Sequence, residues 1–183
     1  MTSRTIAGAF LCEYFPGPML DLNRKEVETR RPGLSAAAQD LYDRFAPHDM
    51  AVAREILDAD ASVQAALLPA IAAKTLHLLE AKTRWTAAHR PRWLLGQLLR
   101  ANLPLREKDL ILLAEHTGTL RSHWRFDTIV PLAPLLDVVE QYVEAHGLSD
   151  AMRSALSELH RRVEPYRANR RAAGRIEAIL HQS

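Results

Sequence analysis

The sequence predicts an all-α protein, folded as a short right-handed array of antiparallel helix pairs, and three observations lead to this prediction. Apolar residues recur at helical spacing in most segments after residue 34. Proline and glycine divide these segments into helix-sized lengths. No run of alternating β-branched residues indicates a strand. Together these patterns predict about seven to nine helices in one domain, residues 35–183. An irregular helical bundle is the alternative arrangement.

Residues 1–34 are predicted to form an irregular N-terminal arm. Three aromatic residues, Phe10, Tyr14 and Phe15, lead into a Pro-Gly-Pro sequence at 16–18. Proline and glycine clusters of this kind interrupt regular structure. The aromatic residues indicate that the arm packs on an apolar surface, which could belong to the helical domain or to another subunit.

Several residues mark the expected helix boundaries. Ser35 is a predicted N-cap of a helix that ends before Pro47, and Pro91 suits the first turn of another. Gly118 and Gly147 are predicted to end helices. Four carboxylates are expected at helix starts, where they complement the helix dipole: Asp60, Glu107, Asp109 and Asp150.

Apolar stripes indicate which helix faces are buried. One narrow stripe consists of Met152, Leu156, Leu159 and Val163. A second contains Ala172, Ile176 and Ile179. Two wider stripes consist of Trp93, Leu94, Leu95, Leu98 and Leu99, and of Leu135, Leu136, Val138, Val139, Tyr142 and Val143. The wider stripes predict that these two helices are central.

A related pattern occurs three times, in residues 51–59, 93–101 and 137–145. Each segment has an apolar pair, two spacers, a second apolar pair, a spacer and an alanine. After each alanine comes a break and then a second amphipathic helix, carrying Leu67 and Leu68, Leu112 and Leu113, or Leu156. Helix pairs at this period are typical of HEAT and armadillo arrays, in which each pair buries its face against its neighbours.

The stretch from residue 93 to residue 180 resembles a more particular family. It contains Leu-Leu-Arg-Ala-Asn-Leu-Pro-Leu-Arg-Glu-Lys-Asp-Leu at 98–110, His-Gly-Leu-Ser at 146–149 and Arg-Ile-Glu-Ala-Ile-Leu at 175–180. This order is similar to the helical-repeat region of large bacterial proteins that also carry WGR-type or MolR-like domains. The resemblance implies a fold and no catalytic residue, because its motifs are helix caps and core leucines.

The basic residues are unevenly distributed along the chain. The net charge is +2, with 24 Lys and Arg against 22 Asp and Glu. Residues 1–60 contain 7 basic and 10 acidic side chains, and residues 61–183 contain 17 and 12. An acidic first third is therefore joined to an arginine-rich remainder.

No strong catalytic motif is present. The sequence lacks the glycine-rich phosphate loops, the G-x-S-x-G elbow, H-E-x-x-H and C-x-x-C. His116, His123 and Asp127 are close in sequence, but six residues separate the histidines and Gly118 intervenes, so one helix face does not present them together. We therefore predict no enzyme activity, no cofactor and no metal; an enzymatic alternative using these three residues would require bound metal.

Basic and aromatic residues alternate in two stretches: Lys82, Arg84, Trp85, His89, Arg90, Arg92, Trp93 and Arg100, and then Arg121, Trp124 and Arg125. Arginine binds phosphates and tryptophan stacks on bases, so the pattern is compatible with nucleic acid. The alternative is that the tryptophans anchor helix packing while arginine stems cover apolar surface. A further basic run lies between residues 153 and 175, where a solvated face is the common outcome.

The sequence therefore predicts a non-enzymatic helical interaction module, a scaffold or adaptor, that binds a protein partner, possibly an acidic one. The predicted partner-binding residues are Arg84, Trp85, Arg90, Arg92, Arg121, Arg125, Arg161, Arg162, Arg170 and Arg171. The alternative is a nucleic-acid-binding helical repeat that uses these arginines on phosphates. Because no targeting segment or membrane span is recognised, we expect a soluble cytoplasmic protein. The oligomeric state is left open.

Overall fold

The computed structural model describes residues 34–47, 49–80, 89–117, 119–121 and 126–182. Within these ranges the chain forms eight α-helices, one 3-10 turn and two short strands. The predicted all-α class is confirmed. The predicted N-terminal arm lies outside the described residues, apart from its last residue, Leu34.

The helices in chain order are α3 (Ala36–Arg44), α4 (Met50–Asp58), α5 (Ala61–Glu80), α6 (His89–Arg100), α7 (Glu107–His116), α8 (Leu132–His146), α9 (Asp150–Val163) and α10 (Arg170–Leu180). The 3-10 turn η2 (Arg167–Asn169) joins α9 to α10. Strands β1 (Thr119–Arg121) and β2 (Phe126–Thr128) pair antiparallel between α7 and α8, with Thr119 opposite Thr128. The sequence did not predict this ribbon, because three residues are too few for an alternating pattern.

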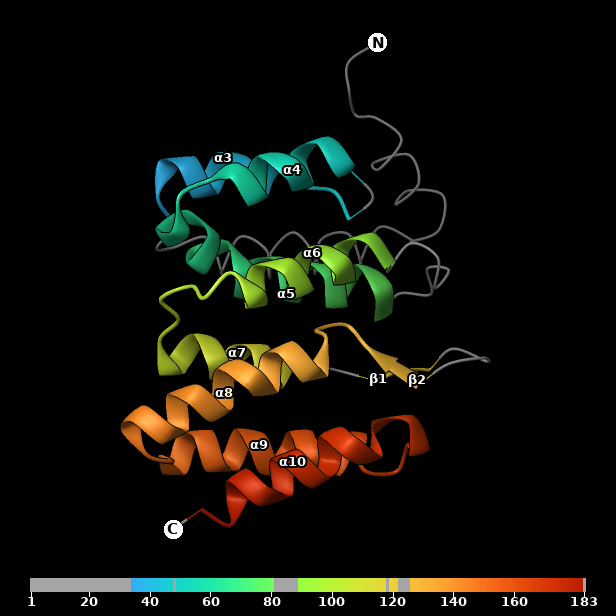
Figure 1. Cartoon of the computed structure of the whole chain (residues 1–183). Coiled ribbons are helices and arrows are strands. Elements are labelled where there is room, and N and C mark those ends of the chain that lie inside the picture. Colours follow the sequence, from blue (N-terminus) through green and yellow to red (C-terminus); the bar gives the residue numbers. More distant parts are fainter. Residues whose placement is uncertain (1–33, 48, 81–88, 118, 122–125, 183) are drawn as a thin grey trace.

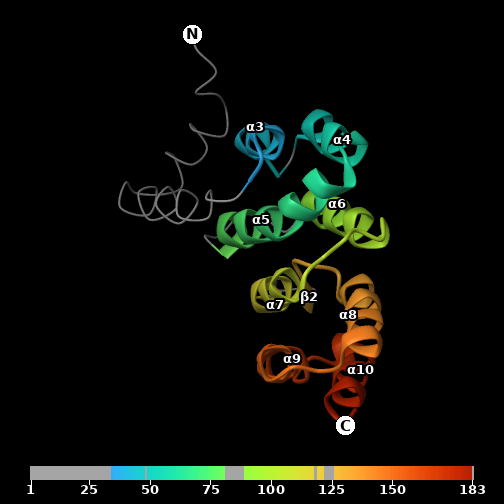
Figure 2. The same ribbon diagram turned by 90° about the vertical axis from the view of Figure 1, so that its left-hand side faces the viewer.

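The helices stack in two layers (Figures 1 and 2). α3, α5, α7 and α9 contact one another in turn along one layer, and α4, α6, α8 and α10 do so along the other. Each helix also packs on its partner in the other layer, as α9 does on α10. The three segments with a common pattern lie mainly in α4, α6 and α8, which follow one another within a single layer.

Local sequence explains where the helices begin and end. The Ser35 hydroxyl accepts a hydrogen bond from the Ala38 amide at 3.3 Å, as its predicted N-cap role requires. Gly147 ends α8 with φ of 82°, a conformation that glycine adopts without strain. Both predictions are confirmed. The four predicted carboxylates also lie at helix starts: Asp60 precedes α5, Glu107 and Asp109 lie in the first turn of α7, and Asp150 begins α9.

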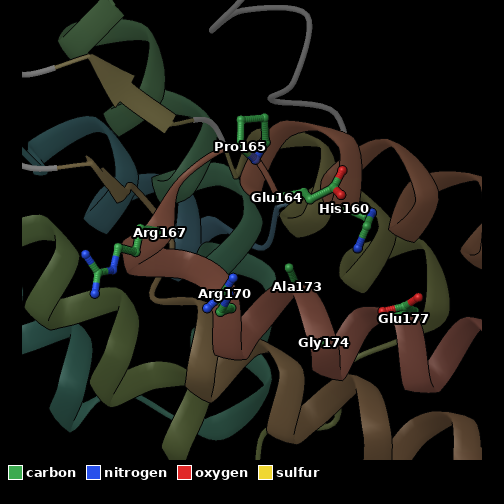
Figure 3. Close-up of a pocket in the computed structure, with 8 residues that line it drawn as sticks. All are labelled: His160, Glu164, Pro165, Arg167, Arg170, Ala173, Gly174 and Glu177. Atoms are coloured by element: carbon green, nitrogen blue, oxygen red, sulfur yellow. The ribbon is translucent and has the colours of Figure 1, made fainter.

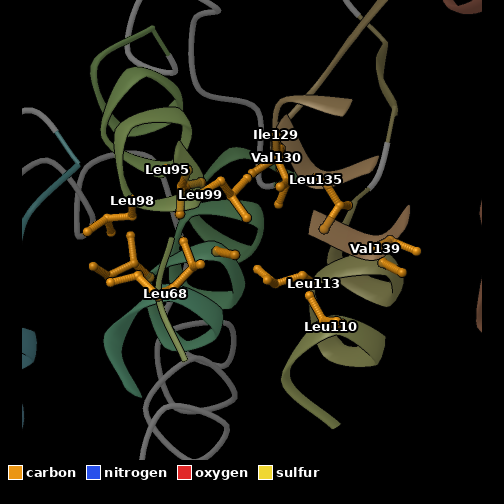
Figure 4. Packing of buried hydrophobic residues seen from close by; sticks show 14 of the residues in the cluster. Leu68, Leu95, Leu98, Leu99, Leu110, Leu113, Ile129, Val130, Leu135 and Val139 are labelled. Carbon is orange, nitrogen blue, oxygen red and sulfur yellow. The ribbon is translucent and has the colours of Figure 1, made fainter. Parts of the chain in front are cut away.

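The core lies between the layers and between successive helix pairs. Figure 4 shows leucines of α5 and α6 opposite leucines and valines of α7 and α8. The stripe predicted for α9 is fully confirmed, since all four of its residues are buried. Burying each of these side chains contributes up to about 3 kcal/mol to the stability of the fold, in proportion to its apolar area.

Two predicted core residues lie at the surface instead. Trp93 is 45% exposed and Leu112 is 37% exposed, so these two core predictions were wrong. Successive residues of a helix point about 100° apart, and both side chains lie on the face opposite the buried one. The sequence stripes included them because each adjoins a buried leucine, Leu94 or Leu113.

Candidate interaction interface

The order of the helices brings particular connections to one end of the stack. Because successive helices run antiparallel, the start of α6, the ribbon between α7 and α8, and the turn between α9 and α10 share one end, seen on the right in Figure 1. The Arg92 Nε donates to the Thr128 carbonyl oxygen at 2.8 Å, which ties the start of α6 to β2. Strand β2 in turn contacts η2.

We name this region the basic end and define it, among the described residues, as Arg90 and Arg92, strands β1 and β2, η2, and Arg170 with Arg171. Arginines from both of the basic stretches recognised in the sequence are present here. The start of α6 and the start of α10 therefore lie at the same end of the stack, with β2 hydrogen-bonded to Arg92 and in contact with η2.

The predicted binding residues differ in how far the structure describes them. Arg84, Trp85 and Arg125 lie outside the described residues, as does His123 of the rejected metal site. Arg121 ends β1, and its backbone alone is described, paired with Phe126. Arg90 is exposed in the first turn of α6, whereas Arg92 is half-buried against β2.

Arg162 has a contact within the fold that its sequence position did not reveal. Its guanidinium donates to the carbonyl oxygens of Ala114 and Glu115, both at 2.8 Å, at the C-terminal end of α7. Positive charge here complements the helix dipole, and the two hydrogen bonds add to the one that the Ala114 carbonyl oxygen accepts from the Thr117 amide. Burial is the largest influence on the pKa of Arg162 and lowers it, although Glu158 acts in the opposite direction.

Other arginines of the C-terminal run also contact groups within the domain. Arg161 pairs with Glu158 one turn earlier, with Nη2 and Oε1 at 2.7 Å, and this hydrogen bond raises the pKa of Arg161. Arg175 crosses from α10 to Glu140 of α8, and Arg153 donates to the Leu180 carbonyl oxygen. Arg161 nevertheless stays largely exposed, so its pair is a solvated one.

Three arginines at the basic end remain without such contacts. Arg167, Arg170 and Arg171 are exposed, and within the described part of the chain none has a hydrogen-bonded or ionic side-chain partner. Arg170 and Arg171 were predicted as binding residues. Arg167 belongs to the basic run between residues 153 and 175, and no sequence signal distinguishes it from its neighbours.

A cleft of about 730 Å³ opens beside these arginines, between the end of α9, η2 and the first turns of α10 (Figure 3). Its lining residues are His160, Glu164, Pro165, Arg167, Arg170, Ala173, Gly174 and Glu177. The lining combines charges of both signs with small residues. This cleft was not predicted, because it depends on the angle at which η2 returns the chain to α10.

The described residues contain neither a cluster of metal ligands nor a membrane-spanning helix. No three histidine, cysteine, aspartate or glutamate side chains lie together there as metal ligands would. Nor is any helix in the described ranges both long and apolar enough to cross a membrane.

No family model, curated protein or solved structure gives a significant match to this chain.

Proposed function

We propose that this protein is a non-enzymatic helical interaction module that binds an acidic surface of a protein partner through its basic end. In this proposal the stacked helix pairs form a right-handed HEAT- or armadillo-like array, in keeping with the resemblance of residues 93–180 to the repeat regions that accompany WGR-type and MolR-like domains. The array acts as a cytoplasmic scaffold that holds its connecting segments in a fixed arrangement.

One observation carries the proposal: Arg167, Arg170 and Arg171 are exposed and unpaired within the described residues, on η2 and at the start of α10. Nearby arginines such as Arg162 are occupied by contacts inside the domain. Arginine is enriched at protein interfaces because its planar guanidinium forms two-point contacts with carboxylates. Three unoccupied guanidiniums on a helix start and its preceding turn provide such contacts.

The carboxylates of the same region favour a protein over a nucleic acid. Glu164 and Glu177 line the same cleft as Arg167 and Arg170, and neither glutamate has an ion-pair partner among the described residues. They would repel a continuous row of phosphates, whereas a protein surface can place charges of either sign opposite them. The net charge of +2 is also small for a protein that binds nucleic acid without sequence preference.

A direct comparison of ligands tests the proposal. The full chain is titrated with a fluorescent glutamate-rich peptide and with duplex DNA at about 50 and 200 mM salt, because phosphate binding imposes a steep salt dependence. We expect the peptide to bind at both salt concentrations and more tightly than DNA at the higher one. Tighter binding of DNA, with a steep salt slope, would replace this proposal with the nucleic-acid alternative.

A further inference from the structure

Opposite charges line the cleft on its two sides without pairing. In Figure 3, Arg167 and Arg170 lie to the left, while Glu164, His160 and Glu177 lie to the right. Within the described part of the chain, no side-chain hydrogen bond or ion pair satisfies any of these five groups. The cleft therefore has one basic side and one acidic side, and we call it two-ended.

The same two helices form ion pairs readily elsewhere. Arg161 bonds to Glu158 within α9, and Arg175 of α10 reaches Glu140 of α8 at 2.6 Å. In the cleft, by contrast, the charged side chains of α9, η2 and α10 form no ion pair within the described residues. Since a solvated surface ion pair is worth little, the two ends remain available to a ligand.

The floor of the cleft is made of small residues. Ala173 and Gly174 lie between the two charged ends, and a methyl group added at Gly174 would meet no atom within 4 Å. Glycine inside a helix is less stable than alanine. Its lack of a side chain here leaves room for the backbone of another chain to approach α10.

The spacing of the two charged ends sets the spacing of a ligand's charges. Arg170 and Glu177 are seven residues apart on α10, which corresponds to about 10 Å along the helix axis. An extended chain advances about 3.3 Å per residue, so about three residues span this distance. Cleft volumes of several hundred cubic ångströms are typical of sites for ligands of this size.

We propose that the cleft binds an extended peptide segment of the protein partner that carries an acidic and a basic side chain about three residues apart. The acidic side chain contacts Arg170 and Arg167, and the basic one contacts Glu177 and Glu164. The peptide backbone passes over Gly174. This inference rests on the proposed function and specifies the partner surface: one of mixed charge, with its two signs at a fixed spacing.

Charge exchange provides the test. A short Gly-Ser peptide with one glutamate and one lysine about three positions apart is titrated into the 15N-labelled full chain, and amide shifts of α10 are followed by NMR. We expect Arg170→Glu and Glu177→Arg each to weaken binding by about fivefold or more. The double variant should restore it, because the peptide can bind in the reverse direction. Failure of the double variant to recover would overturn the inference.

A steric variant checks the position of the peptide without changing charge. Gly174→Phe fills the floor of the cleft, and Ala151→Phe adds the same bulk at an exposed position at the start of α9, at the opposite end of the stack. We expect the first to abolish the peptide-induced shifts and the second to leave them unchanged. Equal behaviour of the two variants would show that the peptide does not occupy the cleft.

The outcomes separate this inference from the function on which it rests. If Glu177→Arg strengthens binding of the glutamate-rich peptide and the mixed-charge peptide does not bind, the basic end is an acidic-surface receptor and the two-ended cleft is wrong. If neither peptide binds the wild-type chain, the proposed function itself fails.

Discussion

Arg175 of α10 and Glu140 of α8 form a two-point ion pair, with Nε donating to Oε1 at 2.8 Å and Nη2 donating to Oε2 at 2.6 Å. The two side chains are only 26% and 33% exposed. The hydrogen bonds that Arg175 donates to Glu140 are the main reason that the pKa of Arg175 is raised. The pair connects the last helix to its neighbour within one layer, at the point where the stack ends.

This pair should contribute measurably to stability. A double-mutant cycle with Arg175→Met and Glu140→Gln should show a coupling free energy of about 0.5–1 kcal/mol in urea unfolding. Methionine keeps most of the apolar stem, so packing changes little. The coupling should decrease at high salt. A value indistinguishable from zero would mean that α10 is held by its apolar face alone.

Arg161 and Arg162 offer a matched comparison, because they are adjacent on α9 and differ in their contacts. Arg162→Met removes two hydrogen bonds to the end of α7 and should cost about 1–2 kcal/mol of unfolding free energy. Arg161→Met removes an exposed, solvated pair with Glu158 and should cost clearly less unfolding free energy than Arg162→Met. Chemical denaturation of both variants checks this order, and equal losses would contradict the capping role of Arg162.

The two glycines at Gly174 and Gly147 should respond in opposite directions to alanine. Gly174→Ala meets open space in a helix and should stabilise the protein by about 0.5–1 kcal/mol. Gly147→Ala places a side chain at φ of 82° and should destabilise it by about 1 kcal/mol or more. In thermal unfolding, the melting temperature of Gly174→Ala should therefore lie above that of the wild type, and the melting temperature of Gly147→Ala below it.

The Arg44 and Glu55 pair should make the first helix pair sensitive to acid. The hydrogen bond from Arg44 lowers the pKa of Glu55 below its ordinary value of 4.5, more than any other influence. The folded state therefore holds the carboxylate ionised more strongly than the unfolded state does. Its stabilisation is present above pH 4.5 and is lost as the pH falls through the lower, folded-state pKa.

Urea midpoints of the wild type and Glu55→Gln across this range provide the measurement. The wild type should have the higher midpoint near neutral pH, and the difference should disappear in acid. A difference that grows as the pH falls would reverse the sign of this linkage and refute the pairing.

Much of the fold follows from local sequence signals, because helix boundaries depend on a few nearby residues. Ser35 caps a helix start through its hydroxyl, and Gly147 ends a helix through its positive φ, both as the sequence predicts. The site was less predictable. The sequence identified the arginine runs, but it could not separate Arg162, which contacts α7, from Arg170, which contacts solvent. That distinction depends on contacts between residues nearly fifty positions apart, which no local pattern encodes.

The measurement that tests the central claim most directly compares two triple variants of equal charge. Arg167, Arg170 and Arg171 are changed to Gln at the basic end, and Arg54, Arg100 and Lys108, exposed elsewhere on the stack, are changed to Gln in the control. Affinity for the glutamate-rich peptide is measured at one salt concentration. We expect the first variant to lose most of the binding and the control to bind like the wild type within about twofold. Equal losses in the two variants would contradict a localised interface at the basic end.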